Sequence, residues 1–297
     1  MDPHHAEFES LLPKRDYSRR AFVRTSLGSG FAAAVLPVSA QAIRTPSTGL
    51  VTGEVTIESN GFKLPAFRAM PEGRSDLPVV LVVSEVFGVH EYIADVARRF
   101  AHAGCFAVAP ELFARHGDPQ SYGELARLMA EVVGRTGDAE VMGDLDTCVA
   151  WARAQGADVR RLAITGFCWG GRITWLYDAH SSAPGRVPVR AAVAWYGRLV
   201  GDATPLQPTH PVEVAGRLAG PVLGLYGGAD AGIPLEHVER MKAALRAGNP
   251  AARASEIVVY PDAPHAFHAD YRPSYRAAAA QDGWRRTLAW LGAHGVA

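Results

Sequence analysis

The segment Gly166-Phe167-Cys168-Trp169-Gly170-Gly171 has the residue types of a sharp turn that presents a nucleophile. It joins an apolar run at Leu162–Thr165 to a helical pattern at Arg172–Asp178. In such a turn the residues two before and two after the nucleophile lack side chains, because a Cβ atom would collide there. The positive end of the following helix favours a thiolate at Cys168, and the backbone N–H of Trp169 is aimed at an oxyanion formed beside it. The spacing therefore predicts nucleophilic catalysis by Cys168.

A nucleophile turn of this kind predicts an acid after a later strand and a histidine after the last strand. Asp230 follows the apolar run Val222–Tyr226, and His265 follows the run Ser255–Tyr260. Ligands bind at the carboxyl ends of parallel strands, where both loops would lie. We therefore predict that Cys168, Asp230 and His265 form a catalytic triad.

Three other interpretations compete with this one. Glycine-rich turns also bind dinucleotides, but that fingerprint needs a glycine where Cys168 stands. His268 is a rival base, and with His265 it suggests a metal pair; without a third ligand nearby we predict no metal. Asp262 is a rival acid, although it is too close in sequence to His265 for the usual order.

A second loop, Ser84 to His90, follows the apolar run Leu77–Val83 and carries another candidate group. The backbone N–H of Val86 is the predicted second oxyanion donor, since the loop after an early strand supplies it in this architecture. Glu85 has two interpretations. It is either a capping or surface acid before a helix, or a carboxylate that binds and activates the Cys168 thiol.

Alternating strands and helices must position these residues. Runs that match strands buried on both faces stand at Leu77–Val83, Cys105–Ala109, Leu162–Thr165, Ala191–Trp195, Val222–Tyr226 and Ser255–Tyr260. Helical periods stand at Glu91–His102, Asp144–Ala154, Leu235–Ala247 and Ser274–His294. Gly53–Glu58 and Lys63–Ala69 flank a strong turn. The pattern predicts an α/β fold with a mostly parallel central sheet flanked by helices and an antiparallel N-terminal hairpin. Arg115–Gly143 contains no strand pattern and is predicted to form a helical excursion over the sheet edge.

The N-terminal residues are predicted to be an export signal. Arg19-Arg20 precedes an uncharged stretch, Thr25–Ile43, and Ala40-Gln41-Ala42 has the small-x-small pattern of a signal-peptidase site. Several glycines, serines and a proline make the stretch a poor membrane helix. We expect a twin-arginine signal at residues 1–42 and one domain at 43–297. The predicted location is periplasmic or secreted, in a bacterium, with no stable membrane association after signal removal.

Composition excludes several classes of protein. In 297 residues, hydrophobic side chains make up 48%, which excludes a mainly disordered chain. Thirty basic and thirty acidic residues cancel, which argues against a nucleic-acid partner. Three cysteines are too few for a disulfide framework. We expect a monomer that needs no cofactor and acts on or binds a small molecule.

Five segments in this order resemble the dienelactone hydrolases (carboxymethylenebutenolidases), over roughly Gly49 to Ala297. The segments are Glu85-Val86-Phe87-Gly88-Val89, Ala109-Pro110-Glu111-Leu112-Phe113-Ala114-Arg115, Gly166 to Gly171, Gly227-Gly228-Ala229-Asp230 and His265-Ala266-Phe267. The resemblance implies an α/β-hydrolase fold and the triad already predicted. It also implies that Glu85 contacts the thiol in the resting enzyme and is released when substrate binds. The implied reaction is thiolate attack on a lactone or ester carbonyl, with the oxyanion held by Val86 and Trp169, followed by hydrolysis.

Two departures from the family limit the substrate. The family's arginine four residues after the catalytic histidine, which binds the substrate carboxylate, is Ala269 here. Arg127 and Arg272 are the candidate replacements. An export signal is also unusual for a cytoplasmic degradation enzyme, so we predict hydrolysis of lactones or small esters rather than of dienelactone itself. The alternative is a non-catalytic binding protein on the same scaffold. A thiol redox protein is the weakest hypothesis, because the chain has no C-x-x-C pair.

Overall fold

A computed structural model describes residues 42–296 of the chain. An eight-stranded sheet runs through this part in the order β1-β2-β4-β3-β5-β6-β7-β8. Its strands are β1 (Leu50–Ser59), β2 (Phe62–Pro71), β3 (Pro78–Val83), β4 (Phe106–Pro110), β5 (Asp158–Phe167), β6 (Ala191–Trp195), β7 (Val222–Gly227) and β8 (Glu256–Tyr260). The six strands β4, β3, β5, β6, β7 and β8 follow one another in the sheet, and each is parallel to its neighbours among them. β2 is antiparallel to both β1 and β4. The predicted α/β class is confirmed.

The N-terminal hairpin is confirmed and is longer than its sequence pattern indicates. β1 and β2 pair without interruption from Leu50↔Pro71 to Ser59↔Phe62. Asn60 and Gly61 close the turn with φ of 49° and 78°, a left-handed conformation that asparagine and glycine tolerate best. The hairpin extends the parallel sheet at one edge.

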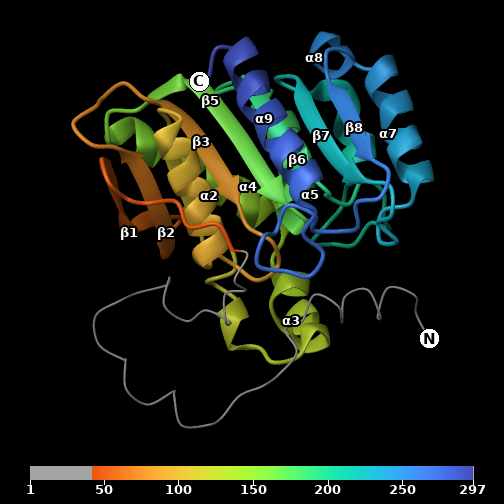
Figure 1. Cartoon of the computed structure of the whole chain (residues 1–297), viewed down its shortest axis with the longest axis horizontal. Helices are drawn as coiled ribbons and strands as arrows, with labels where there is room; N and C mark the ends of the chain where they lie inside the picture. The colour runs from red at the N-terminus through yellow and green to blue at the C-terminus, as the bar shows by residue number, and fades with distance from the viewer. Residues whose placement is uncertain (1–41, 297) are drawn as a thin grey trace.

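Helices cover both faces of the sheet. Figure 1 shows α2 and α9 in front of the sheet and α4 and α5 behind it. The helices are α2 (Glu91–His102), α3 (Leu125–Glu131), α4 (Asp138–Ala154), α5 (Trp169–Ser181), α6 (Pro211–Val214), α7 (Leu235–Ala247), α8 (Pro250–Arg253) and α9 (Ala277–Ala293), with short 3₁₀ turns at Pro119–Ser121, Val133–Arg135 and Ala215–Arg217. Among the strands they cover, β3, β4, β6 and β7 are apolar and buried along their whole length. Among the described residues, no helix has the length and apolarity needed to cross a bilayer.

The strand-free region from Arg115 to Gly143 is helical, as predicted, but its place differs from the prediction. It holds α3, two 3₁₀ turns and the start of α4, and α3 projects below the sheet rather than over its edge (Figure 1). Met129 and Val133 from this region line the cavity that contains Cys168. The excursion is therefore part of the wall of the candidate site.

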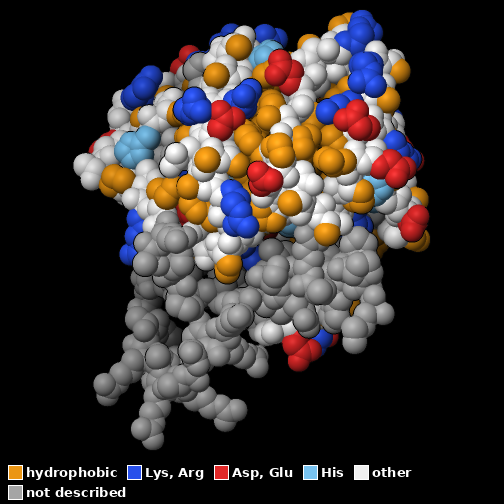
Figure 2. Space-filling view, turned by 45° about the vertical axis from the view of Figure 1, so that its right-hand side comes forward, with side chains coloured by type: hydrophobic (Ala, Val, Ile, Leu, Met, Phe, Trp, Pro, Cys, Tyr) orange, Lys and Arg blue, Asp and Glu red, His pale blue; other side chains and the backbone are white. Residues whose placement is uncertain are grey.

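The surface carries charges of both signs. Figure 2 shows hydrophobic side chains gathered near the middle of one face, with Lys, Arg, Asp and Glu interspersed around them. This face has no broad field of one sign.

Candidate active site

Cys168 lies in a strained turn at the carboxyl end of β5. Its φ is 56° and its ψ is −114°, a conformation that side-chain-bearing residues rarely adopt. A Cβ atom at Gly166 would lie 2.2 Å from the carbonyl oxygen of Gly170, and one at Gly170 would lie 2.4 Å from the carbonyl oxygen of Val83. The two flanking glycines are therefore needed for steric reasons, as the sequence indicated.

His265 and Asp230 meet directly. Nδ1 of His265 lies 2.7 Å from Oδ2 of Asp230, and Asp230 is only 5% exposed. Burial lowers the pKa of His265, but the nearby Asp230 carboxylate and Cys168 outweigh it and hold the pKa well above 6.5. Asp230 follows β7 and His265 lies in the loop between β8 and α9. The structure thus brings these two predicted residues together.

Cys168 and His265 line one cavity of about 110 Å³, together with Val86 and Trp169. The cysteine is half-buried, so a ligand can reach its sulfur. Nε2 of His265 is buried and has no hydrogen-bond partner within residues 42–296, although Cys168 is near enough to raise the pKa of the ring. Catalytic hydrogen bonds are often long before substrate binds. The free nitrogen can therefore accept a proton at this cavity.

Val86 and Trp169, whose backbone N–H groups are the predicted oxyanion donors, line the same cavity. Neither of them donates a hydrogen bond to a residue in the described part of the chain. Trp169 is also the first residue of the 13-residue helix α5, where the helix dipole favours negative charge. Two uncommitted donors on residues that share a cavity with Cys168 can stabilise an oxyanion.

Glu85 is a buried carboxylate in a polar cluster of its own. Its Oε2 accepts a hydrogen bond from the Tyr271 hydroxyl at 2.7 Å and lies 3.5 Å from Nε2 of His90. Nη2 of Arg272 lies 4.0 Å from the same oxygen. Burial raises the pKa of Glu85, but Arg272, His90 and Tyr271 together lower it to about 2. Glu85 is therefore a permanent anion at neutral pH.

The thiol contact implied for Glu85 is not formed in this structure. Within residues 42–296, no hydrogen bond joins Glu85 to Cys168. A carboxylate with a pKa of about 2 is also a weak base for a thiol, whose usual pKa is ~8.5. In this arrangement Glu85 supplies charge near the site rather than a proton acceptor.

The rival residues are accounted for. His268 is 2% exposed and its Nδ1 lies 2.6 Å from the Tyr92 hydroxyl. Burial and the positive charge of Arg99 hold its pKa well below 6.5. Asp262 is exposed, whereas Asp230 binds the imidazole. The described residues contain no cluster of side chains that could hold a metal ion.

The two candidate carboxylate anchors lie elsewhere. Arg127 is exposed on α3, pairs with Glu131 at 3.0 Å and does not line the cavity. Arg272 is buried, stacks on Phe87 at 4.6 Å and belongs to the Glu85 cluster. Neither guanidinium is therefore at the cavity surface.

Two arginines that sequence reasoning missed do line the cavity. Arg172 is bound by Asp138 through two contacts of 2.7 and 2.8 Å, so its charge is already balanced. Arg198 is exposed and forms no ion pair within the described residues. Its place directly after a predicted strand, Ala191–Trp195, was the signal that could have found it.

Glu111 was also missed, although it lies within one of the five segments that resemble the family. It is 2% exposed, and its Oε2 accepts the N–H of Val89 at 2.6 Å. A Cβ atom at Gly88 would lie 2.4 Å from the same oxygen. Glu111 therefore fixes the loop that carries Glu85 and Val86. Burial raises its pKa to about 7.

The sheet, its covering helices and the turn at the end of β5 define an α/β-hydrolase fold. Comparison with known proteins narrows this class. The sequence profile of the dienelactone hydrolase family matches residues 64–295. The chain belongs to this family and is a hydrolase.

Individual relatives agree with this assignment. A carboxymethylenebutenolidase candidate from Methylorubrum extorquens is 54% identical over 299 residues, which cover 100% of both chains. Another from Escherichia coli (strain K12) is 51% identical over 273 residues, 91% of this chain and 97% of the relative. The crystal structure of a dienelactone hydrolase candidate from Klebsiella pneumoniae has a TM-score of 0.78 and 52% identity, over 82% of this chain and 98% of the other.

Proposed function

We propose that this protein hydrolyses lactones or small carboxylic esters with Cys168 as nucleophile, His265 as base and acid, and Asp230 as the group that orients His265. One observation carries the proposal. Cys168, in its strained turn, shares a cavity with His265, whose Nδ1 is held by Asp230 at 2.7 Å. The free Nε2 is then the nitrogen that serves the sulfur.

The reaction follows from this geometry. Nε2 of His265 takes the thiol proton, and the sulfur of Cys168 attacks the carbonyl carbon. The N–H groups of Val86 and Trp169 bind the resulting oxyanion. When the oxyanion collapses, the C–O bond breaks and the alkoxide takes the proton from His265. A water molecule, deprotonated by His265, then attacks the thioester carbonyl, and the thiolate leaves as the acid product forms.

The cavity also supports a substrate that carries a negative charge away from the scissile bond. No aspartate or glutamate of the described residues lines it, and the charge of Arg172 is balanced by Asp138. Arg198 contributes a guanidinium that can pair with a substrate carboxylate. This assignment replaces Arg127 and Arg272 as the proposed anchor.

The test combines turnover with thiol labelling. The wild-type protein should hydrolyse p-nitrophenyl acetate and simple lactones, and Cys168→Ala should lose activity at least about 10³-fold. Cys148→Ala is the matched control, because Cys148 is fully buried and burial raises the pKa of its thiol. An alkylating agent should modify Cys168 alone. Labelling without turnover of any ester or lactone would contradict hydrolysis and favour the binding-protein alternative.

We propose in addition that residues 1–42 direct export by the twin-arginine route and are removed. The twin arginines and the small-residue site support this proposal. The arginines lie outside the described residues, and the small-residue site ends at Ala42, the first described residue. Intact-mass measurement of the protein from the periplasm of a bacterial host tests it, with Arg19-Arg20→Lys-Lys as the control that should stay unprocessed.

A further inference from the structure

Tyr196 carries a hydroxyl group that the proposed mechanism does not use. The residue borders the cavity that holds Cys168 and His265, and it is fully buried. Its ring packs edge-on against the imidazole of His265, with 5.2 Å between the two ring centroids. Within residues 42–296 its hydroxyl oxygen forms no hydrogen bond. A buried hydroxyl without a partner is uncommon and destabilises the folded state, so a role in function would account for it.

The backbone of Tyr196 is also strained. Its φ is 37°, which a residue with a large side chain seldom adopts. Tyr196 directly follows β6, and its N–H donates to the carbonyl of Leu225 at 2.8 Å. The carbonyl of the preceding residue, Trp195, accepts the N–H of Cys168 at 3.0 Å. The fold therefore holds Tyr196 in a strained conformation beside the nucleophile turn, and such strain is concentrated at functional sites.

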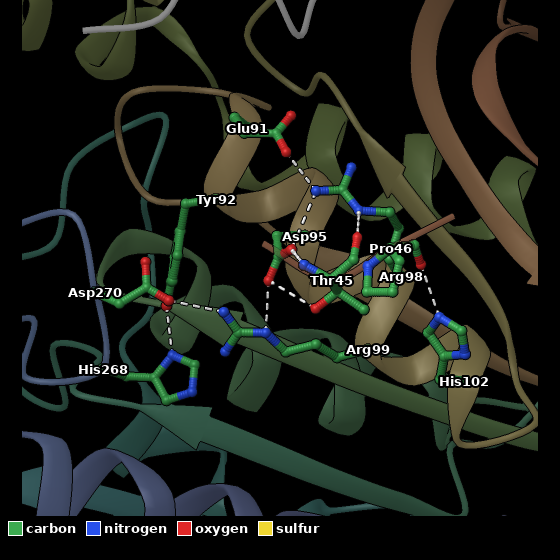
Figure 3. Close-up of polar contacts among 10 residues, drawn as sticks. All are labelled: Thr45, Pro46, Glu91, Tyr92, Asp95, Arg98, Arg99, His102, His268 and Asp270. Atoms are coloured by element: carbon green, nitrogen blue, oxygen red, sulfur yellow. Dashed lines mark hydrogen bonds and ion pairs between the residues drawn. The ribbon is translucent and has the colours of Figure 1, made fainter. Parts of the chain in front are cut away.

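Two other polar groups near the Tyr196 hydroxyl are already engaged. The hydroxyl of Tyr92, which lowers the pKa of Tyr196, lies 2.6 Å from Nδ1 of His268 (Figure 3). Glu85, whose charge raises the pKa of Tyr196, accepts a hydrogen bond from Tyr271 at 2.7 Å. Within the described residues, neither oxygen meets the geometry of a hydrogen bond to Tyr196. The Tyr196 donor is therefore available to another acceptor.

The sulfur of Cys168 is an acceptor whose strength changes during the reaction. A neutral thiol sulfur accepts hydrogen bonds weakly, whereas a hydrogen bond to an ionised acceptor is about twice as strong. Burial raises the pKa of Tyr196 well above 10, and the charges of Glu85 and Cys168 raise it further, so the hydroxyl keeps its proton. Solvent does not reach this hydroxyl, which favours a partner inside the protein over a substrate atom.

We propose that the Tyr196 hydroxyl donates a hydrogen bond to the sulfur of Cys168 whenever that sulfur is a thiolate. The thiol proton passes to Nε2 of His265, as in the proposed reaction, and Tyr196 keeps its own proton throughout. The hydrogen bond is lost when the sulfur forms the thioester, and it returns when the thiolate leaves. Tyr196 therefore stabilises both the attacking and the leaving thiolate. The inference rests on the proposed role of Cys168 as nucleophile.

A test must leave the rest of the site unchanged. Other charged or titratable side chains near these two groups or along the cavity are His265, Arg272, Glu85, Arg172 and Arg198. Tyr196→Phe alters none of them, and it keeps the ring that contacts His265. A change in the ionisation of Cys168 in this variant would therefore come from the hydroxyl group.

The experiment measures the rate at which iodoacetamide alkylates Cys168 in the full chain as the pH is varied, because the thiolate is the reactive form. In Tyr196→Phe the pH of the half-maximal rate should rise by about 1, since the thiolate loses one charge-assisted hydrogen bond. The value of kcat/KM for p-nitrophenyl acetate should fall about 10-fold or more. Tm should stay the same or rise, because the hydroxyl that is removed has no partner in the resting protein.

Tyr177→Phe is the matched control. Tyr177 is buried on α5, and its hydroxyl donates to Oδ1 of Asp146 at 3.1 Å. Its loss should lower Tm by about 2 to 4 °C and leave the alkylation profile unchanged.

Three results would overturn the inference. They are an unchanged alkylation midpoint in Tyr196→Phe, an equal shift in the control, and a loss of turnover in Tyr196→Phe without a shift, which would assign the hydroxyl to the substrate. Alkylation does not depend on hydrolysis. A shifted midpoint in a protein that hydrolyses no ester or lactone would therefore support this inference while contradicting the proposed function.

Discussion

Oδ2 of Asp230 lies 2.7 Å from Nδ1 of His265, across a sequence separation of 35 residues. This contact assigns the proton to Nδ1 and leaves Nε2 as the acceptor on the cavity side. The orientation of the imidazole therefore depends on a carboxylate that solvent barely reaches.

Asp230→Asn should lower kcat/KM by about 10² to 10⁴-fold, because an amide can donate to Nδ1 and favour the wrong tautomer. The pKa of His265 should fall at the same time, since the carboxylate that raises it is gone. Steady-state kinetics and NMR titration of the histidine measure the two effects. Asp262→Asn is the matched control, because Asp262 is exposed and close to His265 in sequence. An equal loss in that control would transfer the orienting role to Asp262.

Gly170→Ala should destabilise the fold by about 3 kcal/mol or more, because the added Cβ would lie 2.4 Å from the carbonyl oxygen of Val83. Chemical denaturation measures the free energy of unfolding. Gly216→Ala is the control, since its nearest neighbour would be 4.0 Å away, and it should change stability by less than about 0.5 kcal/mol. Similar effects at both positions would refute the close packing at the nucleophile turn.

Arg198→Ala should raise KM about tenfold for esters that carry a carboxylate and leave neutral esters nearly unchanged. The difference should shrink at high salt, because the arginine is exposed. Arg127→Ala provides the comparison, since Arg127 is exposed but lies outside the cavity. If both variants lose the same selectivity, the cavity contact is not its source.

Glu111→Gln should alter the pH dependence of stability. The pKa of Glu111 is raised to about 7 in the folded protein, so its contribution is fully present below pH ~4.5 and declines as pH rises through 7. Across that range the wild type should lose roughly 3 kcal/mol of unfolding free energy relative to the variant. Urea titrations at several pH values measure the difference. Glu58→Gln, at an exposed position on β1, should run parallel to the wild type.

Much of the fold could be predicted because its signals are local. Apolar runs predicted the strands of the parallel sheet, because helices bury such strands on both faces. The glycines around Cys168 predicted the turn, because a Cβ atom there would collide with the backbone. The order of Asp230 and His265 along the chain then placed them at one end of the sheet.

Other features depend on side chains that meet across the fold. Arg127 and Arg272 were equal candidates in sequence, yet one is exposed on α3 and the other is buried against Phe87. Two partners of Glu85, Tyr271 and Arg272, come from a loop near the C-terminus, and no local pattern indicates that Tyr271 reaches it. Such contacts are set by tertiary packing, which sequence spacing does not report.

The backbone of Cys168 has a consequence for evolution and engineering. A residue with a side chain is strained at φ 56°, whereas glycine adopts this conformation at little cost. Cys168→Gly should therefore be more stable than Cys168→Ala, by about 1 kcal/mol, while both are inactive. At this position the chain gives up stability for reactivity, so selection for thermal tolerance alone would tend to remove the nucleophile.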